Sequence, residues 1–280
     1  MEVLAGAASA PGFALSWVPS DALRVLTWQE SGADVAETLA AVAVALHLDL
    51  AFVPAGEPWA EDAVRLLRQA DVATAWAVPG VLSRVADQQG WSEVLRRTSV
   101  EPGALAFTLS EVLHDALNDV RRGQATGADT FVIADDLAGQ SGWLLAPDFA
   151  LEALVPCYRQ LAASTGAPFI FHSDGDIRLL YPALAGAGFS AVHIAVPGND
   201  AIRRSFDAAR ASGLVPMGGI EARSLMALGA GATGTFAGGL AAGIGAFICD
   251  DGGMAHAEEL AAYTTALDAA RREAGLPHPE

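Results

Sequence analysis

The sequence predicts a single (β/α)8 barrel, and two observations support that prediction. Short apolar runs that end at Gly, Pro or Asp alternate eight times with stretches rich in Ala, Leu, Arg and Glu, as strands and helices do in βα units. The 280 residues are 52% hydrophobic, which suits one barrel with a large buried core. No linker rich in Pro, Ser or Gly divides the chain, so residues 1–280 are expected to form one domain.

The expected strands are nearly continuous apolar runs, which is typical of parallel strands buried on both faces. They are residues 13–17, 50–54, 74–78, 130–134, 168–172, 191–195, 214–217 and 245–249. The expected helices are residues 33–48, 61–69, 82–97, 110–126, 147–164, 177–187, 200–212 and 256–274. The Gly-rich stretch 229–245 is expected to be a loop or a loosely packed helix.

The basic residues exclude several kinds of chemistry, because all 16 of them are arginines. A Schiff base to a substrate or to pyridoxal phosphate needs a lysine amine, and so does a Walker-type phosphate loop. The net charge of −17 argues against a nucleic-acid partner and against binding to an anionic membrane. Residues 229–234 fit a GxGxxG pattern but follow a helical stretch instead of a strand, so no NAD site is expected.

The cysteine count and the apolar runs predict a cytoplasmic protein. Two cysteines are too few for a disulfide framework, and residues 1–13 lack the Lys or Arg that precedes the apolar part of a secretory signal. The longest apolar run, near residues 40–53, is interrupted by His47 and Asp49, so no membrane span is expected.

Polar residues follow most of the expected strands, at the end where a barrel places its active site. Asp135 and Asp136 follow the fourth strand, and two adjacent carboxylates repel one another unless a cation or a substrate is near. The fifth strand ends at His172, in the polar sequence HSDGD. These three are the expected catalytic residues. Helix capping is the alternative for the two aspartates, and core packing is the alternative for the histidine.

The last three strands supply further candidates. His193 lies within the sixth strand, Asn199 follows it, Glu221 follows the seventh strand and Asp251 follows the eighth. These four are the expected substrate-binding residues, although packing is the favoured explanation for a histidine inside an apolar strand. Cys249 ends the eighth strand and is either a reactive thiol or a small buried hydrophobe.

About half of the chain, residues 125–270, resembles the uroporphyrinogen decarboxylase superfamily. The family's segment after the fourth strand is an Asp, a Gly-containing loop and a helix ending in P-x-Y-[KR], and it resembles ADDLAGQSGWLLAPDFALEALVPCYRQL. The family's strand, His-x-Cys-Gly sequence and next helix resemble PFIFHSDGDIRLLYPALAGAGFSAVHI. The last two strands with their Gly-rich turns are similar to GLVPMGGIEARSL and FICDDGGMAHAEELAAYTTAL.

One branch of that superfamily transfers methyl groups from a corrinoid, carried by a partner protein, to a thiol activated by zinc. The resemblance therefore implies His172, Asp174 and Cys249 as metal ligands, with Asp174 in place of the family's first Cys. Zinc lowers the pKa of a bound thiol, and Asp135 or Asp136 would orient the acceptor. His172 and Asp174 share one face of a strand, so the three donor atoms are expected to converge to within roughly 4–5 Å of one another.

The other branch contains cofactor-free decarboxylases, which makes a lyase acting on a tetrapyrrole or another small carboxylate the alternative. The sequence lacks that branch's Arg-rich N-terminal motif. A barrel mouth lined by Asp135, Asp136, Asp174 and Asp251 would also repel a polycarboxylate, so the methyltransferase is preferred. The second alternative is a non-catalytic binding subunit, because the Cys at position 174 and the Arg motif are both missing.

Overall fold

The structure is a computed structural model that describes residues 3–4, 10–16 and 34–277, and within them the expected barrel is confirmed. Eight parallel strands close in the order β1-β10-β9-β8-β7-β4-β3-β2. Positions 17 and 33, at the ends of an expected strand and an expected helix, lie outside the described residues. The barrel strands are β1 (Gly12–Leu15), β2 (Leu50–Pro54), β3 (Ala73–Pro79), β4 (Thr130–Ala134), β7 (Phe169–Asp174), β8 (Ala191–Ala195), β9 (Val215–Ile220) and β10 (Phe247–Asp250).

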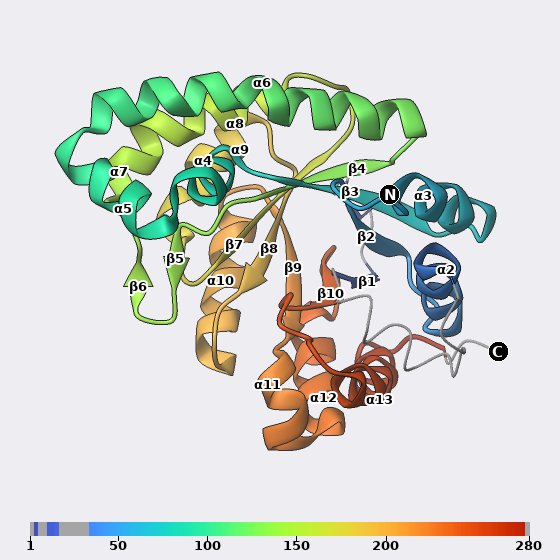
Figure 1. Ribbon diagram of the computed structural model, residues 1–280. Helices are drawn as coiled ribbons and strands as arrows, with labels where there is room; N and C mark the ends of the chain where they lie inside the picture. The colour runs from blue at the N-terminus through green and yellow to red at the C-terminus, as the bar shows by residue number, and fades with distance from the viewer. Residues whose placement is uncertain (1–2, 5–9, 17–33, 278–280) are drawn as a thin grey trace.

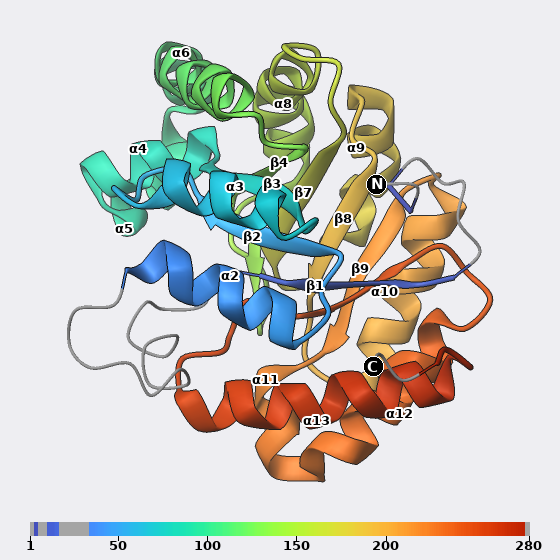
Figure 2. The same ribbon diagram turned by 90° about the vertical axis from the view of Figure 1, so that its right-hand side faces the viewer.

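Helices surround the barrel on its outside (Figures 1 and 2). They are α2 (Val35–Ala45), α3 (Ala60–Gln69), α4 (Val81–Gln89), α5 (Trp91–Val100), α6 (Pro102–Thr126), α8 (Val155–Ala162), α9 (Tyr181–Ala187), α10 (Asn199–Ala211), α12 (Ala230–Ala241) and α13 (Ala257–Glu273). The short helices α7 (Pro147–Phe149) and α11 (Ala222–Ser224) each lead through a π-helical turn into α8 and α12. A two-stranded hairpin, β5 (Ala138–Gly139) and β6 (Gly142–Trp143), follows β4.

Residues 82–97 and 110–126 show two of the larger differences between the expected and the observed helices. Residues 82–97 form two helices, because Gly90 has a φ of 87° and ends α4 before α5 begins. The helix expected at residues 110–126 begins at Pro102 and is 25 residues long. Proline has a fixed φ that suits the first turn of a helix, so it starts α6 well before the expected residue. The long helix α6 lies outside the barrel next to α4 and α8 (Figure 1).

The Gly-rich stretch is a closely packed helix, so the expectation of a loop or a loosely packed helix is wrong. Helices α12 and α13 lie side by side (Figure 2). A Cβ atom on Gly234 would lie 2.0 Å from the Ala266 carbonyl oxygen, and one on Gly238 would lie 2.4 Å from the Ala270 carbonyl oxygen. The glycines therefore allow two helix backbones to approach each other more closely than side chains would permit.

The core has two parts, one inside the barrel and one between the barrel and its helices. The inner cluster draws residues from all eight strands, among them Phe52, Ile170, Met217 and Cys249. Because side chains two positions apart share a face of a strand, His172 lies on the same inner face as Ile170, one step nearer the carboxyl end of β7. Among the described helices, none is both long and apolar enough to cross a membrane.

Candidate functional site

Three side chains converge at the carboxyl ends of the neighbouring strands β4 and β7. Among the described residues, Asp136, His172 and Asp174 form a group whose ligand atoms all lie within 4.8 Å of one another. The His172 Nε2 atom is 3.8 Å from Asp174 Oδ1. His172 is buried and Asp174 is exposed, so the group reaches from the barrel interior to its mouth. We refer to these three residues as the donor group.

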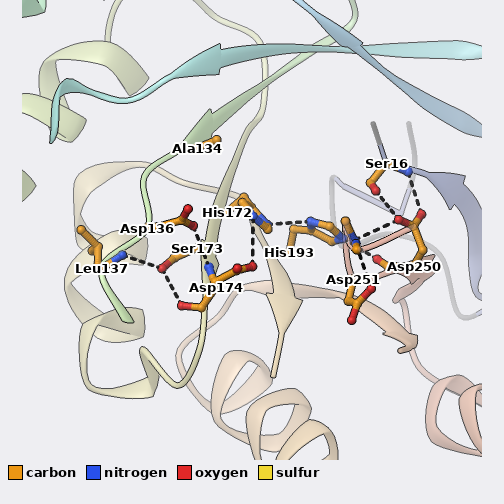
Figure 3. A network of polar contacts seen from close by, with 12 residues as sticks. Ser16, Ala134, Asp136, Leu137, His172, Ser173, Asp174, His193, Asp250 and Asp251 are labelled. Atoms are coloured by element: carbon orange, nitrogen blue, oxygen red, sulfur yellow. Dashed lines mark hydrogen bonds and ion pairs between the residues drawn. The ribbon is translucent and has the colours of Figure 1, made fainter. Parts of the chain in front are cut away.

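Hydrogen bonds between the ends of β4 and β7 fix the donor group (Figure 3). The Asp136 carboxylate accepts from the backbone N–H of Asp174 at 3.1 Å, and the Ser173 hydroxyl accepts from the backbone N–H of Leu137 at 2.9 Å. Gly175 follows with a φ of 75°, and a Cβ atom there would lie 2.7 Å from the Gly139 nitrogen. The β5–β6 hairpin therefore packs directly against the loop that carries Asp174.

A second histidine contacts the donor group from the neighbouring strand β8. His172 and His193 are partners in the β7–β8 register, and their Nδ1 atoms are 2.9 Å apart. His193 Nε2 lies 2.6 Å from the backbone carbonyl oxygen of Asp250. Burial lowers the pKa of His172 well below its usual range, and the charge of His193 adds to that effect. Burial also lowers the pKa of His193, although Asp250 opposes the shift.

The carboxylate of Asp250 is held on the opposite side from these histidines (Figure 3). It accepts hydrogen bonds from the backbone N–H of Ser16 at 2.8 Å, from the Ser16 hydroxyl and from the backbone N–H of Gly252 at 2.9 Å. Asp250 thereby ties β1 to the end of β10, and its position, including that of its carbonyl, is fixed by the fold.

The barrel mouth concentrates negative charge. Burial, together with the charges of Asp136 and Asp251, raises the pKa of Asp174 to about 6. The pKa of Asp251 also rises to about 6, first through burial and then through the charge of Asp250. Carboxylates with raised pKa values in a cleft are typical of sites that hold a cation or carry out proton transfer.

The donor group contributes to the lining of two cavities. A polar cavity of about 220 Å³ is lined by Asp174, Glu221, Arg223 and Asp251, among others. A more apolar cavity of about 260 Å³ is lined on its polar side by Asp136, His172 and Ser83, and otherwise by residues such as Pro54 and Val78. Each cavity is therefore lined by part of the donor group.

The donor group fits a divalent cation. Zinc–ligand distances of about 2.0–2.2 Å place tetrahedral ligand atoms roughly 3.3–3.6 Å apart, close to the 3.8 Å between His172 and Asp174. One imidazole and two carboxylates suit zinc, and three protein ligands leave a further position for a substrate, as in catalytic zinc sites. The two carboxylates would also neutralise the charge of a divalent ion.

Cys249 does not take part in this group, contrary to the expectation for it. Its side chain belongs to the apolar cluster inside the barrel and is completely buried, with Sγ 3.5 Å from Asp250 Oδ1. Burial and the neighbouring Asp250 charge raise the pKa of the thiol well above its usual range, which disfavours the thiolate that a metal requires. Strand β10 is three strands away from β7 in the barrel, whereas β4, which leads to Asp136, is adjacent.

Asp135, one of the expected catalytic residues, is not part of the donor group and lines neither cavity. Asp135 and Asp136 both follow the last residue of β4, but their carboxylates have different hydrogen-bond partners. Asp135 is fully buried and accepts hydrogen bonds from the N–H groups of Leu82 and Ser83, at the start of α4, and from the Tyr158 hydroxyl. Burial raises its pKa, and these hydrogen bonds oppose the rise. The geometry therefore favours the alternative role for Asp135, which is to cap a helix.

The expected substrate-binding residues are separated by the structure. Glu221 and Asp251 line the polar cavity. His193 is fully buried, lines neither cavity and contacts His172 instead of an open space. Asn199 is exposed at the start of α10 and is not among the described residues that line either cavity.

Two polar residues of the polar cavity were missed by the sequence interpretation. Among the described residues that line this cavity, Arg223 is the only basic one. With the Gln140 amide turned to suit its neighbours, its oxygen accepts from Arg223 Nη1 at 2.9 Å and Nη2 at 3.1 Å. Their positions in the sequence could have identified them. Arg223 lies two residues after a Glu that follows a strand, and Gln140 lies in the loop after β4.

Comparison with known proteins establishes the fold. No protein-family model matches the chain, and no curated protein matches it. Among solved structures it is similar to a methyltransferase from Methanosarcina mazei, with a TM-score of 0.73 and 16% identity over 97% of this chain and 96% of that one. It is also similar to a chain of the Amycolatopsis orientalis BexX/CysO complex, with a TM-score of 0.50 and 15% identity over 98% and 96% of the two chains.

Proposed function

We propose that this barrel is a metal-dependent methyltransferase that transfers a methyl group to a thiol. The observation that carries the proposal is the donor group, in which Asp136, His172 and Asp174 converge and which contributes lining residues to both cavities. A transfer reaction needs two reactants to approach one point, and we assign one cavity to each reactant. The similarity in fold to a solved methyltransferase over nearly the whole of both chains supports the same class.

Asp136, His172 and Asp174 would hold a divalent cation such as Zn²⁺. A bound cation would lower the pKa of an acceptor thiol and favour its thiolate at neutral pH. The chain itself supplies the orientation. A hydrogen bond from the backbone N–H of Asp174 holds the Asp136 carboxylate in place, and the contact with His193 holds the His172 ring. Both residues are thereby positioned before a reactant arrives.

The two cavities differ in chemical character, which suggests a division of roles. The more apolar cavity, next to His172 and Asp136, suits a methyl group. The polar cavity, next to Asp174, offers carboxylates and Arg223 to a polar reactant. A corrinoid on a partner protein, which the family resemblance implies, is proposed as the methyl donor.

Zinc binding by the purified chain tests the proposal first. We expect about one Zn²⁺ per chain in competition with a chromophoric chelator, by the one-site argument. Asp174→Asn and Asp136→Asn keep the side-chain shape and should each raise the Kd at least about tenfold, or roughly 1.4 kcal/mol. Asp176→Asn is the matched control, because Asp176 lies in the same loop but its carboxylate pairs with Arg178 at 2.6 Å. Equal loss of affinity in the control would contradict the assignment.

Activity is tested with free methylcobalamin and a panel of small thiols, with the methyl thioether measured by mass spectrometry. We expect zinc-dependent product formation that is lost in Asp174→Asn and retained in Asp176→Asn. Zinc binding without any turnover would favour the binding-subunit alternative, particularly if the chain also captured a corrinoid protein.

A carboxy-lyase is the second candidate, and Arg223 favours it. This guanidinium faces the polar cavity beside Asp174 and can pair with a substrate carboxylate. Release of CO₂ from a small carboxylate, abolished by Arg223→Gln and by Asp174→Asn, would place this candidate ahead of methyl transfer. Conversion of uroporphyrinogen to coproporphyrinogen would identify the tetrapyrrole form of the same reaction.

A further inference from the structure

A chain of three contacts runs from the end of β10 to the donor group, and it constrains where protons can lie. A backbone carbonyl has no hydrogen to give, so His193 Nε2 must donate to the Asp250 carbonyl oxygen across their 2.6 Å contact. In a neutral imidazole the other nitrogen is then an acceptor. His193 Nδ1 is that acceptor, and it faces His172 Nδ1 at 2.9 Å.

The next contact fixes the proton of His172 in turn. If His193 Nδ1 accepts, His172 Nδ1 must donate, and a neutral His172 then carries its lone pair on Nε2. That atom is the one that lies 3.8 Å from Asp174 Oδ1. A lone pair and a carboxylate oxygen that face each other repel, and a cation between them turns both into ligands.

We propose that His193 is a positioning residue that, through the Asp250 carbonyl, holds His172 in the Nδ1-protonated tautomer and so presents Nε2 to the cation. The inference rests on the proposed metal site and adds a function for a histidine that touches no cavity. In metal sites, the hydrogen bond made by the second ring nitrogen sets the ligand's tautomer and orientation in this way.

The surroundings of His193 hold this arrangement rigidly. The Asp250 carboxylate is fixed by Ser16 from β1 and by Gly252, so its carbonyl has little freedom to turn. Phe52 packs edge-on against the His193 ring, with ring centroids 5.4 Å apart. The His172 and His193 rings are inclined by 33°, and their register across β7 and β8 sets that geometry.

The tautomer of His172 can be measured in the metal-free protein by long-range ¹H–¹⁵N correlation after histidine labelling. The chain has six histidines, so assignment by single substitution is practical. We expect His172 to show a protonated Nδ1 and an unprotonated Nε2, the reverse of the form that prevails for free histidine in water. A protonated Nε2 on His172, with His193 carrying both protons, would overturn the proposal.

Two substitutions test the link to the metal. His193→Leu removes both hydrogen bonds, and we expect it to shift His172 toward the Nε2-protonated tautomer and to weaken Zn²⁺ binding on the order of 10- to 100-fold. His193→Gln keeps one donor and one acceptor at a similar spacing, so it should restore most of the affinity. Equal weakening by both variants, or no weakening by Leu, would contradict the positioning role. If His193→Leu does not fold, the tautomer of His172 in the wild-type spectrum and the zinc affinity of His193→Gln test the positioning role.

The two proposals fail separately in these experiments. If wild-type His172 has the expected tautomer but the chain does not bind Zn²⁺, the positioning role of His193 is supported and the metal site is refuted. If the chain binds Zn²⁺ but His172 has the other tautomer before metal is added, the positioning role of His193 is refuted and the metal site is supported.

Discussion

The Nδ1 atoms of His172 and His193 lie 2.9 Å apart in the barrel interior, although 21 positions separate the two residues in the chain. Parallel pairing of β7 with β8 produces the contact, because it sets the two histidines opposite each other on the inner face. The pair connects a donor group at the barrel mouth to a backbone carbonyl on the far side of the barrel. Substitutions in the barrel interior, such as at His193, should therefore alter the properties of the donor group at the mouth.

Cys249 provides a direct test of which side chains bind metal. We expect Cys249→Ala to bind Zn²⁺ with unchanged stoichiometry and affinity, because the thiol lies in the apolar cluster and not in the donor group. Loss of the buried sulfur should lower the free energy of unfolding by about 1 kcal/mol. Zinc binding and urea unfolding measure the two effects. A variant that no longer binds zinc would restore the thiol as a ligand.

Asp251 should make the protein less stable as the pH rises. Its pKa is about 6 in the folded protein, whereas an unfolded Asp titrates near about 3.9. Between these values the folded state holds the extra proton, so the contribution of Asp251 to stability is fully present below about pH 4 and is lost as the pH rises through 6.

Asp251→Asn removes that titration and keeps an oxygen for the backbone N–H groups of Ala222 and Gly253. We expect the variant to be more stable than the wild type at pH 8 and of similar stability at pH 4, as measured by urea unfolding. Asp87→Asn, at an exposed helical position, is the control and should show no such difference. A gain of stability that is the same at both pH values would rule out this explanation.

Two glycines in α12 should respond in opposite directions to the same substitution. Gly234→Ala places a methyl group 2.0 Å from the Ala266 carbonyl oxygen, so α12 and α13 must separate, and we expect a loss of about 2 kcal/mol. Gly231→Ala, in the same helix, meets nothing within 4 Å and should gain up to about 1 kcal/mol from helix propensity. Thermal unfolding of both variants measures the difference. Equal effects would mean that the two helices pack less closely.

Asp135 should matter for stability and not for metal binding. Asp135→Asn leaves one oxygen where the carboxylate accepted from Leu82, Ser83 and Tyr158, so buried donors lose partners. We expect a loss of about 2–3 kcal/mol in the free energy of unfolding and an unchanged Kd for Zn²⁺. Tyr158→Phe removes one of the same hydrogen bonds and should cost about 1 kcal/mol. A large loss of zinc affinity in the folded Asp135 variant would return this residue to the site.

The pattern of the sequence determined the barrel and part of the donor group. Buried parallel strands are nearly all apolar, so their order along the chain was visible as runs such as residues 130–134 and 191–195. Barrel sites form at the carboxyl ends of strands, which was sufficient to select Asp136, His172 and Asp174 as candidates. None of these inferences needed a contact between distant residues.

Only the tertiary structure decided which candidates meet. Adjacent Asp135 and Asp136 both follow the end of β4, yet Asp135 accepts hydrogen bonds from the start of α4, whereas Asp136 accepts from Asp174 on β7. His172 contacts His193 because of the register between β7 and β8, and that register cannot be read from the sequence. Cys249 remains apart because strand order and the packing of the barrel interior enclose it among apolar side chains. Local periodicity reflects burial, whereas convergence at a site depends on the closure of the whole sheet.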